Sequence, residues 1–318
     1  MVVEGNCIEI AQETIGPGRS QVLEIPVSRL PTQTMLSLPV TVINGEQPGK
    51  KLWLSAAIHG DELNGVEIIR RVLTKIQPKQ LRGTLIAVPI VNVFGFVEQS
   101  RYLPDRRDLN RSFPGSAKGS LASRLANLFM QEIVSQCDYG IDLHTAAIHR
   151  VNLPQIRANL EDKRTYECAK AFAPEIVIHA TTRDGSLRQA ATKRGIPVLL
   201  YEAGEALRFD YHAIAKGVSG IFRVMNHLDM FDYPEGNCPK VSQEARRTKW
   251  VRASRGGIFH LSVALGQKVR KKDKLGTITD AFGQSNYTIK ASSDGIVISY
   301  TLNPLVNQGD AIVHLAIC

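Results

Sequence analysis

The chain has 318 residues, of which 43% are hydrophobic and 22% are charged, a composition typical of one large globular domain or two unequal ones. Its net charge of +9 comes from 39 basic and 30 acidic residues, but no basic run is interleaved with aromatic residues, which argues against nucleic-acid binding. It has no run of about 18 apolar residues and no secretory leader, so we expect a cytoplasmic protein without a membrane partner.

Short apolar segments alternate with helical periods over the first 233 residues. Strands are predicted where β-branched and large apolar residues form short runs, at 21–27, 35–43, 51–58, 85–91, 139–144, 175–180 and 197–204. Helices are predicted where apolar residues recur with a helical period, at 65–76, 120–136, 160–173, 185–195 and 212–228. This alternation predicts an α/β fold with a mixed, mostly parallel sheet flanked by helices.

The composition changes near residue 240, after a polar segment that is rich in turn residues. No convincing helix follows, and short strand-like segments are separated by glycine-bearing turns, at 250–254, 256–263, 267–280, 287–292, 294–302 and 310–317. We therefore expect two domains, an α/β domain over residues 1–240 and a small all-β sandwich over residues 241–318.

Two strand ends carry residues that are typical metal ligands. The strand at 51–58 leads into His59 and Glu62, whose spacing lets one turn aim an imidazole and a carboxylate at the same point. His144 ends another predicted strand, and the carboxyl ends of parallel strands share one edge of a sheet. The three residues would form a two-histidine, one-glutamate zinc site with an open fourth position, holding one Zn²⁺ per chain. Asp142 is placed to hydrogen-bond a liganding imidazole.

A loop at 101–115 is dense in arginines, and a third strand end carries Glu202. Guanidinium groups pair with carboxylates in a bidentate manner, so the loop suits a small anionic substrate, although a solvated loop is an equally good interpretation of this segment alone. Glu202 lies at the same predicted sheet edge as the zinc ligands. A carboxylate there can take a proton from water and return it to a leaving nitrogen.

Taken together, the motifs HGDELNG, DLNRSFPG, DLHTA and YEAGE resemble the succinylglutamate desuccinylase/aspartoacylase family, a branch of the zinc carboxypeptidase fold. The resemblance covers about residues 35–230 and is far more specific than any single motif. It implies a zinc-dependent hydrolase domain in which His59, Glu62 and His144 hold the metal. It further implies that Asn110 and Arg111 hold the substrate carboxylate.

The resemblance also implies roles for an arginine and a glutamate at the reacting bond. Arg101 matches the arginine that polarises the scissile carbonyl, but the stretch before DLNR is two residues longer than in aspartoacylases. Arg106 or Arg107 could therefore take that role, and Arg106 is kept among the substrate-binding candidates. Glu202 matches the general acid/base, with Glu205 as the alternative.

The C-terminal segment resembles the small β-sandwich of biotinyl and lipoyl carriers. The hairpin that would display a modifiable lysine reads TDAFGQSNYT, at 279–288, and contains no lysine, so carrier function is not expected. A lid, a wall of the substrate pocket or an oligomer contact remains as its role, and the sequence leaves homo-oligomer formation open.

The function expected from the sequence is a zinc-dependent amide hydrolase that removes an acyl group from an N-acyl amino acid or a related N-acyl amine. A metallocarboxypeptidase is the alternative within enzymes, because it needs the same carboxylate clamp. A non-catalytic binding protein of the same fold would lack a ligand or the base, and none is missing. Among the other histidines, His149 is a candidate for substrate contact, whereas His314 and the rest are assigned structural or surface roles.

Overall fold

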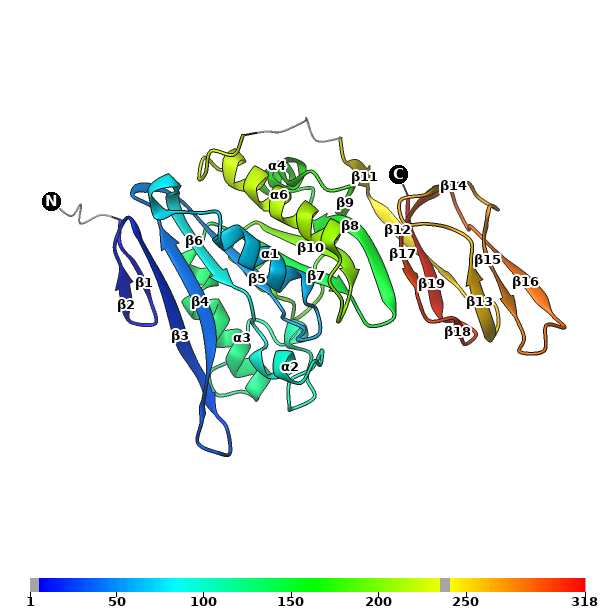
Figure 1. The fold of residues 1–318 in the computed structure, drawn as a ribbon, viewed down its shortest axis with the longest axis horizontal. Helices are drawn as coiled ribbons and strands as arrows, with labels where there is room; N and C mark the ends of the chain where they lie inside the picture. The colour runs from blue at the N-terminus through cyan, green and yellow to red at the C-terminus, as the bar shows by residue number, and fades with distance from the viewer. Residues whose placement is uncertain (1–5, 235–240, 318) are drawn as a thin grey trace.

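The computed structural model describes residues 6–234 and 241–317, a mixed α/β part followed by an all-β part (Figure 1). The predicted boundary between residues 240 and 241 falls at the end of segment 235–240, which lies outside the described residues. No helix in the described ranges is both long and apolar enough to cross a membrane.

The strands of the α/β part surround a parallel group. They are β1 (Ile8–Ile10), β2 (Glu13–Ile15), β3 (Arg19–Arg29), β4 (Met35–Asn44), β5 (Gln47–Ala56), β6 (Arg82–Val88), β7 (Tyr139–Ala146), β8 (Arg150–Ala158), β9 (Ile176–His179) and β10 (Val198–Glu205). Strands β6, β5, β7 and β10 are parallel neighbours in that order. Antiparallel strands flank this group, with β4 and β3 beyond β6 and with β8 beyond β10.

Helices cover both faces of this sheet (Figure 1). The α-helices are α1 (Asn64–Leu73), α2 (Val93–Val97), α3 (Leu121–Glu132), α4 (Lys163–Phe172), α5 (Leu187–Lys193) and α6 (Tyr211–His227), and short 3₁₀ turns are η1 (Pro78–Gln80), η2 (Leu109–Arg111) and η3 (Val134–Gln136). Apolar side chains of α1, α4 and α6 share one buried cluster with the sheet, and those of α3 and α5 share another. The expected α/β fold with a mixed sheet between helices is confirmed.

Alternation along β5 divides its side chains between the two cores. Leu52 and Leu54 belong to the cluster with α1, whereas Trp53 belongs to the cluster with α3, because successive side chains of a strand point to opposite faces. Trp53 is fully buried and needs space on the neighbouring strand. Gly140 of β7 provides it, since a Cβ atom there would lie 2.0 Å from Cζ2 of the indole.

Strand β8 was not expected from the sequence. It contains Pro154, which cannot donate a backbone hydrogen bond and normally disfavours a strand interior. Pro154 lies where the pairing of β8 with β10 is irregular. Glu202 pairs with Gln155 and Gly204 pairs with Asn152, and the register shifts between these two pairs. On its other side, β8 pairs with a C-terminal strand up to Asn152 and with β9 from Gln155 onward.

The C-terminal part contains only strands within the described residues. They are β11 (Gln243–Ala245), β12 (Arg247–Arg252), β13 (Gly257–Leu261), β14 (Lys268–Val269), β15 (Lys274–Thr279), β16 (Asn286–Lys290), β17 (Gly295–Thr301), β18 (Leu305–Val306) and β19 (Ala311–Ile317). A four-stranded sheet, β16-β15-β13-β18, shares a buried core with strands β12, β17 and β19. The predicted division at residues 240 and 241 stays a prediction.

The large sheet continues from the α/β part into the C-terminal part. Its longest path has the order β12-β19-β17-β8-β10-β7-β5-β6-β4-β3, so β17 pairs directly with β8, and β11 pairs with β9. A small apolar cluster at this junction includes Ile176 and Ile178 of β9 together with Ile296 and Ile298 of β17. Backbone pairing and apolar packing therefore fix the two parts against each other.

This junction predicts that truncating Ile298 destabilises the protein. Ile298 is fully buried, and an Ile298→Ala substitution should lower the free energy of unfolding by about 2–5 kcal/mol, because it leaves a cavity between the two parts. Leu305→Ala is the matched control: Leu305 is 66% exposed, so its loss should change stability by no more than about 0.5 kcal/mol. Urea denaturation followed by fluorescence measures both, and equal effects would contradict the packing assigned to Ile298.

Candidate active site

The turn after β5 brings His59 and Glu62 together. The backbone N–H of Glu62 donates to the carbonyl of His59 at 3.1 Å, and His59 Nδ1 lies 2.7 Å from Glu62 Oε1. Gly60 lets this turn pack against α2, because a Cβ atom at that position would lie 1.9 Å from the carbonyl carbon of Gly95. The expected juxtaposition of imidazole and carboxylate therefore depends on a position that tolerates no side chain.

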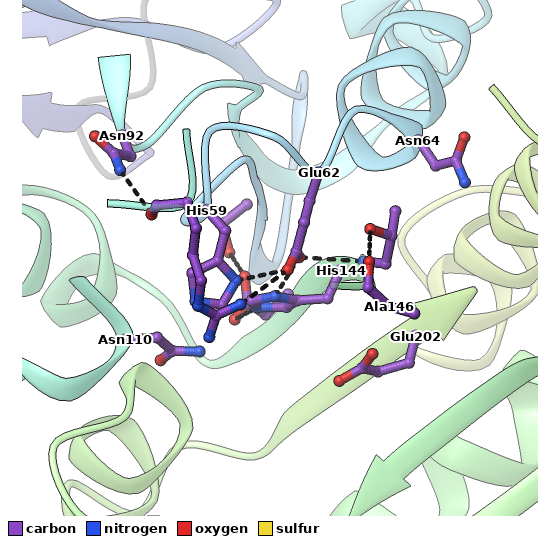
Figure 2. Close-up of polar contacts among 12 residues, drawn as sticks. His59, Glu62, Asn64, Asn92, Asn110, His144, Ala146 and Glu202 are labelled. Carbon is purple, nitrogen blue, oxygen red and sulfur yellow. Dashed lines mark hydrogen bonds and ion pairs between the residues drawn. The ribbon is translucent and has the colours of Figure 1, made fainter. Parts of the chain in front are cut away.

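Strand β7 brings the second histidine to the same carboxylate. His144 Nδ1 lies 2.8 Å from Glu62 Oε2, and the backbone N–H of Thr145 donates to that oxygen at 3.1 Å. The ligand atoms of His59, Glu62 and His144 all lie within 4.8 Å of one another, and the three residues are buried. Figure 2 shows the Glu62 carboxylate between the two imidazoles. Parallel pairing of β5 with β7 brings these strand ends together.

A carboxylate also holds the far nitrogen of each imidazole. His144 Nε2 lies 2.8 Å from Asp142 Oδ2, and the other oxygen of Asp142 accepts from Ser55 Oγ at 2.8 Å. His59 Nε2 lies 3.1 Å from Asp108 Oδ1. Metal-binding histidines usually have such a carboxylate on the nitrogen that does not face the metal. Asp142 takes the position expected of it, whereas Asp108 was not singled out, although it precedes Asn110 in the DLNR motif.

The site is strongly charged in this arrangement. Burial alone would lower the pKa of His144, but the carboxylates of Asp142 and Glu62 outweigh it and raise that pKa well above 6.5. For His59, burial is likewise outweighed, by Glu62 and Asp108, so its pKa is also raised. Burial would raise the pKa of Glu62, yet the charges of His59 and His144 hold it well below its usual range.

Two imidazoles and one carboxylate form a donor set that fits a divalent metal ion. The Nδ1 atoms of both histidines face the Glu62 carboxylate, whereas both Nε2 atoms are held by other carboxylates. The two Nδ1 atoms and the Glu62 oxygens therefore converge on one point, where a metal ion could replace their mutual contacts. The buried group of His59, Glu62 and His144 is therefore able to hold a metal ion.

The arginine-rich loop contributes unequally to the site. The Arg101 guanidinium donates to Asp108 Oδ2 at 2.9 Å and lies 3.5 Å from Glu62 Oε1, beside the candidate metal group. Arg111 is exposed but lines the same cavity. Arg106 does not line it: its backbone, at φ 60°, forms a turn to the carbonyl of Leu103, and its side chain is exposed. The loop thus places Arg101 at the site, and Arg106 outside it.

Asn110 and Glu202 face the space beside the metal group from two directions. The side-chain carbonyl of Asn110 accepts from the backbone N–H of Leu187 at 3.0 Å, which turns its amide nitrogen toward that space (Figure 2). Glu202 of β10 pairs in register with His144, and its Oε2 accepts from Asn152 Nδ2 at 2.7 Å. Glu205, the alternative acid/base, lies outside the cavity and contacts Arg208 at 3.3 Å.

The candidate metal ligands and the residues that face them line one cavity of about 630 Å³. Its wall includes the three candidate metal ligands together with Arg101, Asn110, Arg111 and Glu202. It also includes residues that sequence reasoning missed, namely Arg157, Arg188, Trp250 and His314. The structural role assigned to His314 was therefore incomplete, because that residue lies in a cavity wall. His149 lies outside the lining, and its carbonyl accepts from the backbone N–H of Leu302.

Comparison with known proteins places these features in a family context. The model of the succinylglutamate desuccinylase/aspartoacylase catalytic domain matches residues 48–228. An N-α-acetyl-L-2,4-diaminobutyric acid deacetylase from Halomonas elongata is 26% identical over 304 residues, which cover 88% of this chain and 85% of that protein. The match to this relative extends beyond the catalytic-domain model into the C-terminal strands.

Solved structures share the fold over nearly the full length. The product-bound ectoine utilization protein EutE (DoeB) from Ruegeria pomeroyi superimposes with a TM-score of 0.84 at 24% identity, covering 96% of this chain and 98% of that one. A succinylglutamate desuccinylase/aspartoacylase from Rhodobacter sphaeroides gives a TM-score of 0.81 at 25% identity, covering 95% and 98%. The C-terminal β region is therefore part of the shared fold.

The raised pKa values of His59 and His144 predict that metal uptake releases protons. Because the pKa of His144 is raised well above 6.5 and that of His59 is also raised, protons on the metal-free imidazoles must be displaced by ligation, so binding at pH 7 should release about one proton per ion and tighten as pH rises. A pH indicator in weak buffer measures the release. His227→Asn, which removes an exposed histidine of α6, should leave it unchanged, and uptake without proton release would contradict the assigned ligands.

Proposed function

We propose that this chain, which belongs to the succinylglutamate desuccinylase/aspartoacylase family, is a zinc-dependent deacylase acting on an N-acyl amino acid or a related N-acyl amine. The observation that carries the proposal is the content of a single cavity. A buried two-histidine, one-glutamate group, a carboxylate at a neighbouring strand end and a guanidinium-rich wall lie together there. A two-histidine, one-glutamate set is among the ligand sets of catalytic zinc.

The metal supplies one part of the chemistry and the side chains supply the rest. Zn²⁺ held by His59, Glu62 and His144 would act as a Lewis acid, acidifying water and polarising the amide carbonyl. Asp108 and Asp142 keep the two imidazoles oriented through their Nε2 atoms.

Glu202 is the proposed proton carrier. Its carboxylate lines the cavity in register with His144, so it can accept a proton from the attacking water and deliver it to the leaving nitrogen. Asn152 Nδ2 donates to Oε2 of this carboxylate at 2.7 Å, which leaves Oε1 without a hydrogen-bond partner among the described residues. Proton return completes the cleavage into a carboxylate and a free amine.

Arg101, Asn110 and Arg111 are proposed to hold the substrate. Arg101 lies beside the metal group, where its guanidinium can donate to the carbonyl oxygen as negative charge develops on it. The Asn110 amide nitrogen and the Arg111 guanidinium line the same cavity and suit a carboxylate. Of the arginines in the loop, Arg101 is therefore the favoured oxyanion donor, and Arg106 has no proposed role.

The C-terminal β region favours small substrates over peptides. Trp250, Ser299 and His314 belong to this region and line the cavity, so of the roles open to the region, a pocket wall is the one we propose. The deacetylase activity of the Halomonas elongata relative supports an N-acyl amino acid as the substrate. A cytoplasmic location and the domain division stay predictions, and homo-oligomer formation stays open.

The substrate class can be tested with a panel of amides. The zinc-loaded protein should release free amine from at least one N-acetyl, N-succinyl or N-formyl amino acid or diamine, and chelation of the metal should abolish the activity until zinc is restored. Tripeptides with a free C-terminus are the comparison set. Faster cleavage of the peptides would favour the carboxypeptidase alternative, and inactivity on the entire panel would contradict the proposal.

The acid/base assignment predicts different outcomes for two neighbouring glutamates. Glu202→Gln should lower kcat about 10²–10⁴-fold with unchanged zinc content, because a proton carrier is lost and no ligand is removed. Glu205→Gln is the matched variant, since Glu205 lies outside the cavity and contacts Arg208. A larger loss for Glu205→Gln would transfer the role to that residue, and full activity of Glu202→Gln would exclude Glu202.

A further inference from the structure

Strand β10 is irregular directly after Glu202. Its pairing with β7 is in register as far as Glu202, but the register shifts between Glu202 and Glu205. Two residues of β10, Ala203 and Gly204, therefore lie opposite the single residue Thr145 of β7, which is the arrangement of a β-bulge. Bulges redirect the side chains beside them, so the direction of Glu202 depends on how this bulge is held.

The side-chain amide of Asn64 holds the bulge. Its Nδ2 donates to the carbonyl of Ala203 at 3.2 Å, and its Oδ1 accepts from the backbone N–H of Asp210 at 3.0 Å. The two partners fix the amide orientation, because only its nitrogen can donate to a carbonyl and only its oxygen can accept from an N–H. The contact is close, since a Cβ atom at Gly204 would lie 2.5 Å from Asn64 Nδ2.

Asn64 also belongs to the segment that positions the metal ligands. It follows Glu62 by two residues, at the start of α1, and it is only 1% exposed. The next residue, Gly65, packs directly on β7, because a Cβ atom there would lie 2.7 Å from the Cβ atom of Leu143. In the view of Figure 2, Asn64 and Glu202 lie on the same side of Glu62. The amide therefore connects the metal-ligand turn to β10.

The backbone on the other side of Glu202 has its own anchor. The hydroxyl of Tyr201 donates to the carbonyl of Ala213, on α6, at 2.7 Å, and Tyr201 is 1% exposed. Helix α6 thus holds β10 before Glu202, and Asn64 holds it after Glu202. The first anchor comes from the helical layer, whereas the second comes from the turn that carries the candidate metal ligands.

We propose that Asn64 is a positioning residue for the reaction. Its amide holds the bulge at Ala203 and Gly204, and this contact sets the place of the Glu202 carboxylate relative to the candidate metal ligands. The inference rests on the proposed function, in which Glu202 carries the proton. Such a contact matters for rate, because a displacement of about 1 Å caused by a change away from the reacting atoms can cost about 10²-fold.

Two substitutions release the bulge to different extents. Asn64→Ala removes both hydrogen bonds and should lower kcat about 10- to 100-fold, with KM and zinc content changed less than about two-fold, because the proposed substrate-binding and metal-binding side chains remain. Asn64→Asp keeps an acceptor for Asp210 but turns an oxygen toward the carbonyl of Ala203, so it should also lower kcat. If Asn64→Ala does not fold, Asn64→Asp decides.

Asn44→Ala is the matched control for the loss of a buried amide. Asn44 is fully buried, donates to the carbonyls of Asn6 and Ile15 at 2.7 and 3.0 Å, and lies outside the cavity. Its loss should lower the midpoint of thermal unfolding about as much as Asn64→Ala does, because each leaves buried groups without partners. At a temperature where both variants are folded, kcat should fall for Asn64→Ala alone.

A double-mutant cycle separates positioning from a general structural role. In the Glu202→Gln background, Asn64→Ala should lower kcat by less than about two-fold more, because the group that Asn64 positions is already lost. A loss of stability or a disturbed metal group would instead lower kcat by the same factor in both backgrounds. Equal factors would overturn the proposal, as would loss of zinc from Asn64→Ala.

Crystal structures of the zinc-loaded protein and of Asn64→Ala give a readout that needs no turnover. The bulge should relax, and the Glu202 carboxylate should move by about 0.5 Å or more relative to His144, the scale at which catalytic geometry is lost. An unmoved Glu202 carboxylate would overturn the positioning role. If the unsubstituted protein hydrolyses no amide, the proposed activity fails, and the displacement of Glu202 decides the role of Asn64 by itself.

Discussion

The Glu62 carboxylate, shared between His59 and His144, is the interaction on which the rest of the site depends. A carboxylate that is only 2% exposed is unfavourable without partners, and its partners come from its own turn and from the adjacent strand. The parallel pairing of β5 with β7 and the bare backbone at Gly60 are the features that bring them within reach. Displacing either strand end would leave a buried charge unpaired.

This dependence explains why the sequence predicted the centre of the site. His59 and Glu62 lie three residues apart, so one turn relates them, and His144 needs only the rule that parallel strands end at a common edge. Glu202 obeys the same rule at β10. Exposure could not be predicted in this way. The resemblance favoured Arg101 but left Arg106 and Arg107 open, and only the folded loop shows that Arg101 lines the cavity and that Arg106 is exposed.

The far end of the cavity lay beyond sequence reasoning for a different reason. It requires β8, whose Pro154 argues against a strand, and it requires β8 to pair with β17, which is about half the chain length away. Nothing local specifies that pairing. His314 looks like an ordinary residue of a predicted strand, and Arg157 lies in a segment for which no strand was predicted. Their shared cavity exists only because the large sheet continues across the junction.

Sheet continuity also has a consequence for catalysis. The metal group lies at the ends of β5 and β7, Glu202 lies on β10, and the wall beyond it lies on β8, β17, β19 and β12, all neighbours in one hydrogen-bonded sheet. Groups attached to such a sheet keep their spacing without loop closure, which favours a substrate of fixed length held in a reactive position. A wall contributed by a separate, hinged domain would lose that constraint. Under the proposed function, the pairing of β8 with β17 would hold the far wall at a fixed distance from the group of His59, Glu62 and His144.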